Sequence, residues 1–321
     1  MIIGILFDTA EAYSQFPKLS ADQFDEFEPE STIQFMEEVI QQLGHNFIHI
    51  PSPYHLLNCS YEVDLIWNIS EGLFSRNREA WGPVLAEMRE IPMLGSDAFT
   101  LTLTLDKITT KKLARFHGVP TSDWKLIKAG SSYSILNFPF PALVKPRYEG
   151  TAKGIGRASI ISHLDEADAV IKRLLNIYQQ DVFLEPLLPG AEYTCAVLGN
   201  PLKVLPVLER GVDNATGLGM HVLEQKGESV EDFSLTHSLS EKEEDEIQNW
   251  CQTLCLELDI RHFARFDFKR DMNEEIQFLE VNPLPTFAVD STFAIYAELE
   301  GKNYVDFMAE YLESILEEFL N

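Results

Sequence analysis

The sequence is poor in positive charge. Its 321 residues include 25 Lys and Arg against 51 Asp and Glu, which gives a formal net charge of −26 at pH 7. Nucleic acids and anionic membranes are bound through clusters of Lys and Arg, so we expect neither as a partner. A polyphosphate ligand would also be repelled, unless a few placed lysines and divalent cations reverse the local field.

Long apolar runs and cysteines are scarce as well. No apolar run reaches the roughly 18 residues of a membrane-spanning helix. The N-terminal segment MIIGILFDTAEAY has no basic region before its apolar run, unlike a secretory signal. The four cysteines lack the spacing of a metal site, and we expect Cys251 and Cys255, one helical turn apart, in the core. These features indicate a reduced, cytoplasmic protein.

Hydrophobic periodicity predicts an α/β protein in three parts, at residues 1–95, 96–184 and 185–321. In the first part, strands are expected at 1–7, 46–50 and 63–69, and an amphipathic helix at 31–44. Such alternation indicates an open parallel sheet, in which ligands collect beyond the carboxyl ends of the strands.

The other two parts mix strands and helices. Helices are expected at 105–118, within 160–176, at 241–258 and from 304 to 320. Strands are expected at 141–146, 181–188, 193–199, 201–209, in HFARFDFKRD and in EEIQFLEVN. Ser240 and Glu243 form a capping box at the start of the third helix. A polar, glycine-rich segment at 211–229 is too long for an ordinary hairpin.

The last two predicted strands carry the strongest local signal for chemistry. Arg265 and Asp267 are two residues apart and project from one face of a strand, and Glu280 and Asn282 do the same on the next. Pairing of the strands would bring two carboxylates and an amide to one spot, the hard oxygen ligands that suit Mg²⁺ held with phosphates. The alternative is a half-exposed hairpin with polar residues in solvent. The complete set of four favours a metal–phosphate site.

The segment KPRYEGTAKGIG, residues 145–156, combines basic side chains with three glycines. A glycine-rich loop can bring its backbone amides close to phosphate oxygens, because no Cβ holds the ligand away. The segment matches neither G-x-x-x-x-G-K-[ST] nor G-x-G-x-x-G. Taken alone, the segment is more typical of an ordinary glycine hairpin than of a phosphate-binding loop.

Five segments resemble the ATP-grasp superfamily and, within it, the D-alanine–D-alanine ligase family. They are LDKITTK (105–111), VKPRYEGTAKGIG (144–156), FLEPLLPGAEYTCAVLG (183–199), ARFDF (264–268) and FLEVNPLPTF (278–287). Each motif is weak alone, but all five keep the family's order and spacing. The resemblance implies an ATP-grasp fold, with an N-terminal open parallel sheet domain followed by two α+β lobes that enclose ATP.

The resemblance also implies an ATP site. The corresponding residues are Lys107, Lys145, Gly150, Gly154, Glu185, Leu187, Leu188 and Glu192. In the family, the lysines neutralise the phosphates and the glycine loop folds over them. Glu185 corresponds to the acceptor for the adenine amino group, the leucines to the wall against the ring, and Glu192 to the ribose-binding acid.

The same comparison implies the metal and catalytic residues. The magnesium ligands would be Asp267, Glu280 and Asn282, holding two ions, for which Mn²⁺ can substitute. The catalytic residues would be Arg265, Thr151 and Lys226. The arginine steadies the acyl phosphate, and the lysine is brought to the γ-phosphate by a mobile loop. The segments 150–156 and 211–229 are the candidates for a lid.

The segments expected to bind the amino-acid substrates depart from the family pattern. The usual Gly-Gly-x-Ser-x-Glu after the first strand is replaced by the longer, acidic FDTAEAYSQFPKLSADQFDEFEPES. Its residues Glu26, Glu28 and Glu30 are candidates for binding a substrate ammonium, the role assigned to Glu28, or all three lie in solvent. Further along, the tyrosine that follows the loop lysine in the family is Gly227, and Ser291 corresponds to a contact of the second substrate's carboxylate.

A second departure lies at residues 68–83, NISEGLFSRNREAWGP, in place of His-Gly-x-x-Gly-Glu-Asp-Gly. Here Glu71, Arg78 and Glu79 are expected to face the substrate. We therefore expect an ATP-dependent ligase that joins a small-molecule carboxylate to an amine, by way of an acyl phosphate. D-alanine–D-alanine ligase itself and a relative with another amino acid or amine are both open.

Two other classes of function remain open at this point. An ATP-grasp phosphotransferase would stop at phosphorylation and release ADP without an amine. A non-catalytic nucleotide-binding regulator is less compatible with the sequence, because binding alone does not require Arg265. The oligomeric state is open too, although the family's members are often homodimers.

Overall fold

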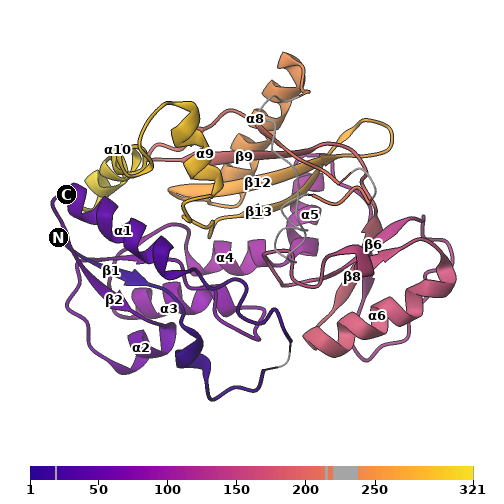
Figure 1. Ribbon diagram of the computed structural model, residues 1–321, viewed down its shortest axis with the longest axis horizontal. Coiled ribbons are helices and arrows are strands. Elements are labelled where there is room, and N and C mark those ends of the chain that lie inside the picture. Colours follow the sequence, from indigo (N-terminus) through magenta and orange to yellow (C-terminus); the bar gives the residue numbers. More distant parts are fainter. Residues whose placement is uncertain (19, 214–215, 220–237, 321) are drawn as a thin grey trace.

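The computed structural model describes residues 1–18, 20–213, 216–219 and 238–320, which form three sheets with helices around them (Figure 1). The first sheet has the order β2-β1-β3-β4, and all its strands are parallel, which confirms the predicted open parallel sheet. Its strands are β1 (Ile2–Leu6), β2 (Asn46–Ile50), β3 (Leu65–Asn68) and β4 (Met93–Leu94). Its helices are α1 (Glu30–Gln42), α2 (Pro53–Asn58) and α3 (Trp81–Met88).

The second sheet is antiparallel, with the order β5-β8-β6-β7. Its strands are β5 (Lys125–Ile127), β6 (Ala142–Pro146), β7 (Ile160–Ile161) and β8 (Val182–Pro186), and α6 (Leu164–Tyr178) packs on it. Two helices precede it, α4 (Ala98–Leu105) and α5 (Lys107–Phe116). The helix predicted from residue 105 begins at Lys107, because Asp106 ends α4 and its side chain caps α5 by accepting from the Thr109 N–H.

The third sheet is also antiparallel and has the order β10-β9-β12-β13, with β11 paired to β9. Its strands are β9 (Glu192–Leu198), β10 (Lys203–Val204), β11 (Leu208–Arg210), β12 (Phe263–Arg270) and β13 (Ile276–Asn282). The strand predicted at 201–209 is divided into β10 and β11, with Pro206 between them; proline cannot donate to a strand ladder.

Helices α8 (Glu241–Glu257), α9 (Thr292–Leu299) and α10 (Tyr304–Leu316) complete the C-terminal part. Single 3₁₀ turns occur at η1 (Ala10–Tyr13), η2 (Arg78–Ala80), η3 (Arg157–Ser159) and η4 (Glu317–Phe319). The capping box of Ser240 and Glu243 is confirmed, and Cys251 and Cys255 are buried, as predicted. No helix of the described ranges is long and apolar enough to cross a membrane.

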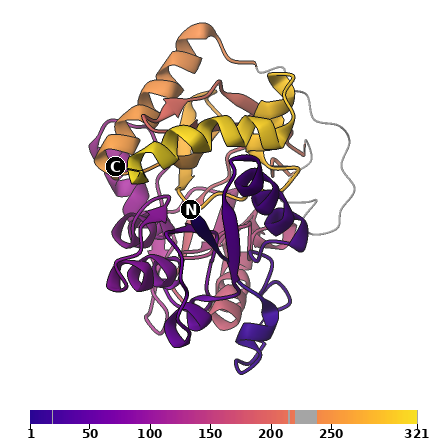
Figure 2. The same cartoon turned by 90° about the vertical axis from the view of Figure 1, so that its left-hand side faces the viewer.

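The N-terminal and C-terminal parts share one core. Ile3 and Trp67 of the first sheet pack in the same apolar cluster as Phe287 and Leu312. Helix α10 contacts α1, as seen from the end of the molecule where both termini lie (Figure 2). The three sheets fall near the three predicted parts, although β8 crosses the expected limit at residue 184, and those limits stay predictions.

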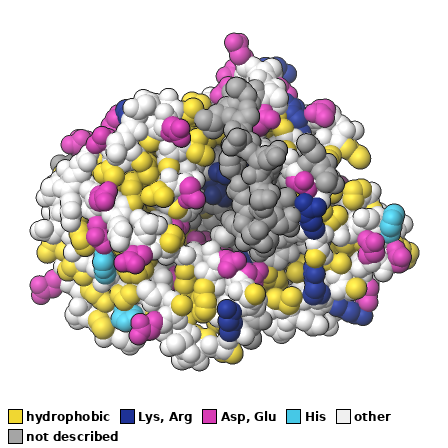
Figure 3. All heavy atoms as spheres, viewed as in Figure 1, with side chains coloured by type: hydrophobic (Ala, Val, Ile, Leu, Met, Phe, Trp, Pro, Cys, Tyr) yellow, Lys and Arg dark blue, Asp and Glu magenta, His cyan; other side chains and the backbone are white. Residues whose placement is uncertain are grey.

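Negative charge is spread over the face of the molecule shown in Figure 3. Asp and Glu side chains are scattered over the face shown in Figure 3 and do not gather into one patch. Acidic side chains do converge inside the molecule, in the site described next.

Candidate active site

The hairpin of β12 and β13 brings together the four polar residues singled out in the sequence. Arg265 pairs with Asn282, and Asp267 pairs with Glu280, which confirms the predicted pairing of the two strands. The carboxylate of Asp267 accepts from Arg265 Nε at 3.0 Å and from Asn282 Nδ2 at 3.2 Å. It also accepts from Thr194 Oγ1 on the neighbouring strand β9, at 2.9 Å. The hairpin therefore presents oxygen ligands at one fixed place.

Helix α5 places a lysine against this hairpin. Lys107, the first residue of α5, lies with its Nζ 2.7 Å from Glu280 Oε2. The helix start is held by Asp106, whose carboxylate accepts two hydrogen bonds from Arg147 at 2.8 and 2.7 Å. Burial alone would raise the pKa of Glu280, but the nearby Lys107 lowers it. Glu280 is therefore held as a carboxylate.

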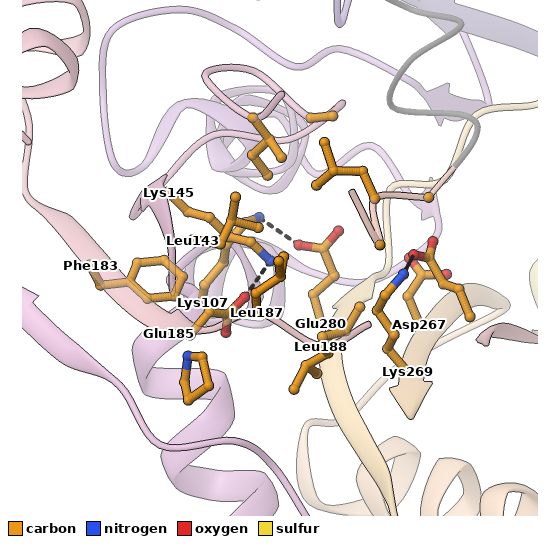
Figure 4. Close-up of a pocket in the computed structure, with 18 of the residues that line it drawn as sticks. Lys107, Leu143, Lys145, Phe183, Glu185, Leu187, Leu188, Asp267, Lys269 and Glu280 are labelled. Carbon is orange, nitrogen blue, oxygen red and sulfur yellow. Dashed lines mark hydrogen bonds and ion pairs between the residues drawn. The ribbon is translucent and has the colours of Figure 1, made fainter. Parts of the chain in front are cut away.

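A second carboxylate, Glu185 on β8, is less exposed than Glu280 and is held by two lysines, of which Figure 4 shows Lys145. Lys145 of β6 forms an ion pair with Glu185 Oε1, and Lys111 Nζ lies 3.0 Å from Oε2. Ser122 Oγ adds a weaker contact at 3.4 Å. Burial opposes ionisation, yet the two lysines hold the pKa of Glu185 at about 2. This cluster fixes the position of Lys145.

These groups surround a pocket that we call the lysine pocket. It is lined by Lys107, Leu143, Lys145, Glu149, Gly150, Ala152, Ile155, Phe183, Glu185, Pro186, Leu187, Leu188, Glu192, Gly217, Leu218, Gly219, Asp267, Lys269, Leu279 and Glu280. The lining combines apolar side chains, such as Leu143, Phe183 and Leu188, with charged ones, a mixture that suits a nucleotide with a flat base and a phosphate chain. Glu192 lies at the same pocket and accepts from Lys269 Nζ at 2.9 Å.

The glycine-rich loop closes one side of the pocket. Gly150 and Ala152 line it, whereas Gly154 is not part of the lining. Gly154 has φ +72°, and a Cβ there would lie 2.8 Å from both Pro146 and Tyr178. That glycine is therefore required by close packing beneath the loop rather than by contact with the pocket.

A larger cavity of about 600 Å³, which we call the acidic cavity, adjoins the lysine pocket. Its acidic lining residues are Asp25, Glu26, Glu28, Glu71, Glu79, Glu192, Asp267, Glu280 and Asp290. Its basic lining residues are Lys107, Arg210 and Arg265. Thr151 and Ser291 also line it, so most of the side chains assigned to the substrate and to catalysis reach this one space.

The three glutamates that are candidates for binding a substrate ammonium lie in different environments. Glu30 is exposed at the start of α1, whereas Glu26 is buried among cations. Glu28 lines the cavity, accepts from Thr32 Oγ1 at 2.8 Å and has no ion-pair partner among the described side chains. Burial raises the pKa of Glu28, against the hydrogen bonds from Thr286 and Thr32. A substrate cation would compensate that burial.

Arg78 occupies a different place from the one expected. Its side chain is 2% exposed and does not line the acidic cavity. It lies among Glu26 at 2.6 Å, Glu71 at 3.1 Å and Glu79 at 3.6 Å. Glu71 and Glu79 do line the cavity, with Arg78 behind them. The guanidinium therefore supports acidic side chains instead of facing a ligand.

Several residues of the site were not predicted. They are Lys111, Lys153, Thr194, Arg210 and Lys269. Two of them carried a signal in the sequence. Lys111 is one helical turn after Lys107 and shares its face of the helix, and Lys269 continues the alternation of Arg265 and Asp267 along β12.

Arg210 adds a buried positive charge beside the hairpin. Its Nε donates to Thr194 Oγ1 at 3.0 Å, and its NH2 donates to Thr292 Oγ1 at 2.6 Å. Burial, followed by the nearby Arg265, lowers the pKa of Arg210. Two other predictions, the loop lysine Lys226 and the departure at Gly227, lie outside the described residues, as does most of the segment 211–229.

Comparison with known proteins shows which family this chain resembles. The family model described as D-ala D-ala ligase C-terminus matches residues 111–313. A D-alanine–D-alanine ligase of Alcanivorax borkumensis is 29% identical over 232 residues, covering 72% of this chain and 71% of the relative. The corresponding ligase of Aquifex aeolicus is 26% identical over 277 residues, covering 83% and 88%.

Solved structures agree in fold. The D-alanine–D-alanine ligase of Bacillus anthracis complexed with ATP has a TM-score of 0.75 at 18% identity, covering 99% of this chain and 98% of that one. The VanG D-Ala:D-Ser ligase of Enterococcus faecalis has a TM-score of 0.71 at 18% identity, with the same coverage. The chain therefore belongs to the D-alanine–D-alanine ligase family, has its ATP-grasp fold, and is an ATP-dependent ligase that forms carbon–nitrogen bonds.

Proposed function

We propose that this ligase uses ATP and Mg²⁺ to join the carboxylate of one small amino acid to the amine of another, by way of an acyl phosphate. The observation that supports this most is the junction of the two cavities. Six residues line both the lysine pocket and the acidic cavity: Lys107, Gly150, Ala152, Glu192, Asp267 and Glu280. A phosphate chain in the first space would end beside a carboxylate bound in the second.

The chemical logic begins with the carboxylate, which is a poor acyl donor because its leaving group would be oxide. Transfer of the γ-phosphoryl group to a carboxylate oxygen converts that oxygen into part of a good leaving group. An amine then attacks the acyl carbon, phosphate leaves, and an amide bond remains. Positioning and charge stabilisation provide most of the catalysis in such phosphoryl transfers.

Lysines and an arginine of this chain would stabilise the transferring group. Lys107 and Lys145 lie at the lysine pocket, where Lys107 can exchange Glu280 for phosphate oxygens and Lys145, still paired with Glu185, can donate its remaining N–H groups to them. Arg265 lines the acidic cavity next to Asp267, in a position to stabilise the acyl phosphate and the tetrahedral oxyanion. Glu185 keeps Lys145 in place, and an unused carboxylate lone pair can accept from the adenine amino group.

The residues of the hairpin fit a magnesium site. Asp267, Glu280 and Asn282 provide two carboxylates and an amide on paired strands. Among the described residues, no group of three or more His, Cys, Asp or Glu is arranged to hold a metal ion by itself. That donor set suits an ion that takes its remaining ligands from phosphates and water. When bound, Mg²⁺ would neutralise charge on the phosphates; we place two ions here, with Mn²⁺ able to replace them.

The acidic cavity suits zwitterions. Glu28 is the proposed partner of the first substrate's ammonium, because it is buried and pairs with no cation of the described chain. Ser291, which caps α9 and contacts Tyr304 Oη at 3.1 Å, is the proposed contact of the second substrate's carboxylate, with Arg210 nearby in the same cavity. A cytoplasmic location and a homodimeric state stay predictions.

A screen of D- and L-amino acids in pairs tests this function. ADP release should require both partners, and mass spectrometry should find a product equal to their sum less one water. ADP release with the carboxylate alone and no condensed product would instead establish a phosphotransferase.

A further inference from the structure

The acidic segment before α1 reaches across to the glycine-rich loop through Glu26. One carboxylate oxygen, Oε1, accepts from the Gly150 N–H at 2.7 Å and from Arg78 NH2 at 2.6 Å. The other, Oε2, accepts from Lys153 Nζ at 2.6 Å. Glu26 belongs to the segment that follows β1, whereas the loop belongs to the second sheet. The bonds to Gly150 and Lys153 therefore connect two separate parts of the fold, and the bond to Arg78 anchors Glu26 within the first part.

The connection is buried and pairs a carboxylate with two cations. The side chains of Glu26 and Arg78 are both 2% exposed, and that of Lys153 is 5% exposed. Burial alone would raise the pKa of Glu26, but Arg78 and Lys153 hold it at about 2. Each cation also has a second acidic partner, Glu149 for Lys153 and Glu71 for Arg78, so Glu26 belongs to a buried network of ion pairs that is costly to disrupt.

A second contact supports the same loop. Asp22 accepts from Tyr178 Oη at 2.5 Å and from the Gly154 N–H at 3.4 Å. Between the two contacts, Thr151 and Ala152 both adopt left-handed backbone, with φ of 45° and 49°. Residues with a Cβ rarely adopt this conformation unless surrounding contacts impose it. The loop is thus held in one particular shape from the N-terminal side.

We propose that Glu26 is a positioning residue that holds the glycine-rich loop closed over the phosphates of bound ATP, with Lys153 as its partner on the loop and Arg78 as its anchor. Lys153 faces Glu26, so neutralisation of the phosphates is left to Lys107 and Lys145. Closure from the N-terminal part would keep water from the acyl phosphate. This role rests on ATP binding at the lysine pocket and is independent of the identity of the amino acids.

Nucleotide binding and amide exchange test the proposal without any amino-acid substrate. The probe is a non-hydrolysable ATP analogue with Mg²⁺. Glu26→Gln should weaken its binding about tenfold and speed amide exchange at residues 149–154 by at least tenfold, as expected when a charged hydrogen bond is lost. Glu30→Gln, an exposed neighbour in the same segment, should change neither. Unchanged binding and exchange in Glu26→Gln would overturn the proposal, and so would tighter binding, which would mean that Glu26 competes with phosphate.

A second set of variants separates positioning from a general loss of stability. Lys153→Met should weaken binding and speed exchange as Glu26→Gln does, and the double variant should lose less than the sum of the two single losses, because both substitutions remove the contact between Lys153 and Glu26. Lys153→Met also removes the ion pair with Glu149. Lys153→Arg keeps the charge and should restore slow exchange. If Glu26→Gln does not fold, the two Lys153 variants decide: equal exchange in the Met and Arg variants would contradict the proposal. Additive losses in the double variant would contradict it as well.

Discussion

Lys107 Nζ lies 2.7 Å from Glu280 Oε2 and joins the start of α5 to the end of β13. The lysine proposed to bind phosphate thus neutralises the carboxylate proposed to bind the metal ion. Binding of ATP with Mg²⁺ would give each a new partner of opposite charge, so neither is left uncompensated in a buried site. The ion pair thus keeps the two functional groups in place before the nucleotide binds.

Glu280→Gln should abolish ATP turnover while leaving the fold intact. The substitution removes the negative charge that a divalent ion requires and hardly changes side-chain volume. We expect phosphate release to fall by about a thousandfold or more, the scale seen when a main electrostatic group is removed. Glu275→Gln, an exposed residue at the start of the same strand region, provides the matched control. Near-normal phosphate release by folded Glu280→Gln would exclude the proposed metal site.

Lys111→Met should destabilise the protein and weaken ATP binding. The substitution leaves the buried Glu185 carboxylate with Lys145 as its only remaining cationic partner in the described site. Breaking a buried ion pair by removing one partner costs about 3 kcal/mol or more. The adjacent Lys112 is exposed, so Lys112→Met is the comparison in chemical denaturation. Equal stability of the two variants would show that Lys111 has no such role.

The pH dependence of stability should change in Glu79→Gln. Burial and the charge of Glu26 raise the pKa of Glu79 to about 7, against Arg78 and Lys107. Because this folded-state pKa exceeds the unfolded value, the wild type loses stability as pH rises from about 5 to 8. Gln mimics the protonated acid, so its stability should not fall in this way. The free energy of unfolding of the variant, relative to that of the wild type, should therefore rise from pH 5 to pH 8 by on the order of 3 kcal/mol.

Denaturation of Glu79→Gln at pH 5 and pH 8 checks this expectation, with the exposed Glu87→Gln as control. A stability difference from wild type that is the same at both pH values would mean that Glu79 is ionised throughout.

The sequence contained enough to predict the metal hairpin. Alternation along β12 and β13 fixes which side chains share a face, and the short connection fixes which strands pair, so the four polar side chains were expected at one spot; the register that places Asp267 opposite Glu280 comes from the structure. The parallel first sheet followed from its alternating strands and helices in the same way. Both predictions depend on neighbours that are close along the chain.

The remaining features depend on contacts between distant segments. Neither the spacing around Arg78 nor its charge shows that it is buried against Glu26, which lies in another segment. Lys153 could not be assigned to Glu26 from a loop whose other basic residues suit phosphates equally well. The break between α4 and α5 is different, because Asp106 before a helical run is a cap signal readable from the sequence.

The most direct test of the acyl-phosphate route is isotope transfer. A carboxylate substrate found in the screen is labelled with ¹⁸O in its carboxyl group and incubated with ATP, Mg²⁺ and the amine. If the γ-phosphoryl group is transferred to the carboxylate, one labelled oxygen must leave with the phosphate when the amide forms. We predict inorganic phosphate carrying one ¹⁸O for each amide bond made. Unlabelled phosphate accompanying labelled amide product would contradict the mechanism.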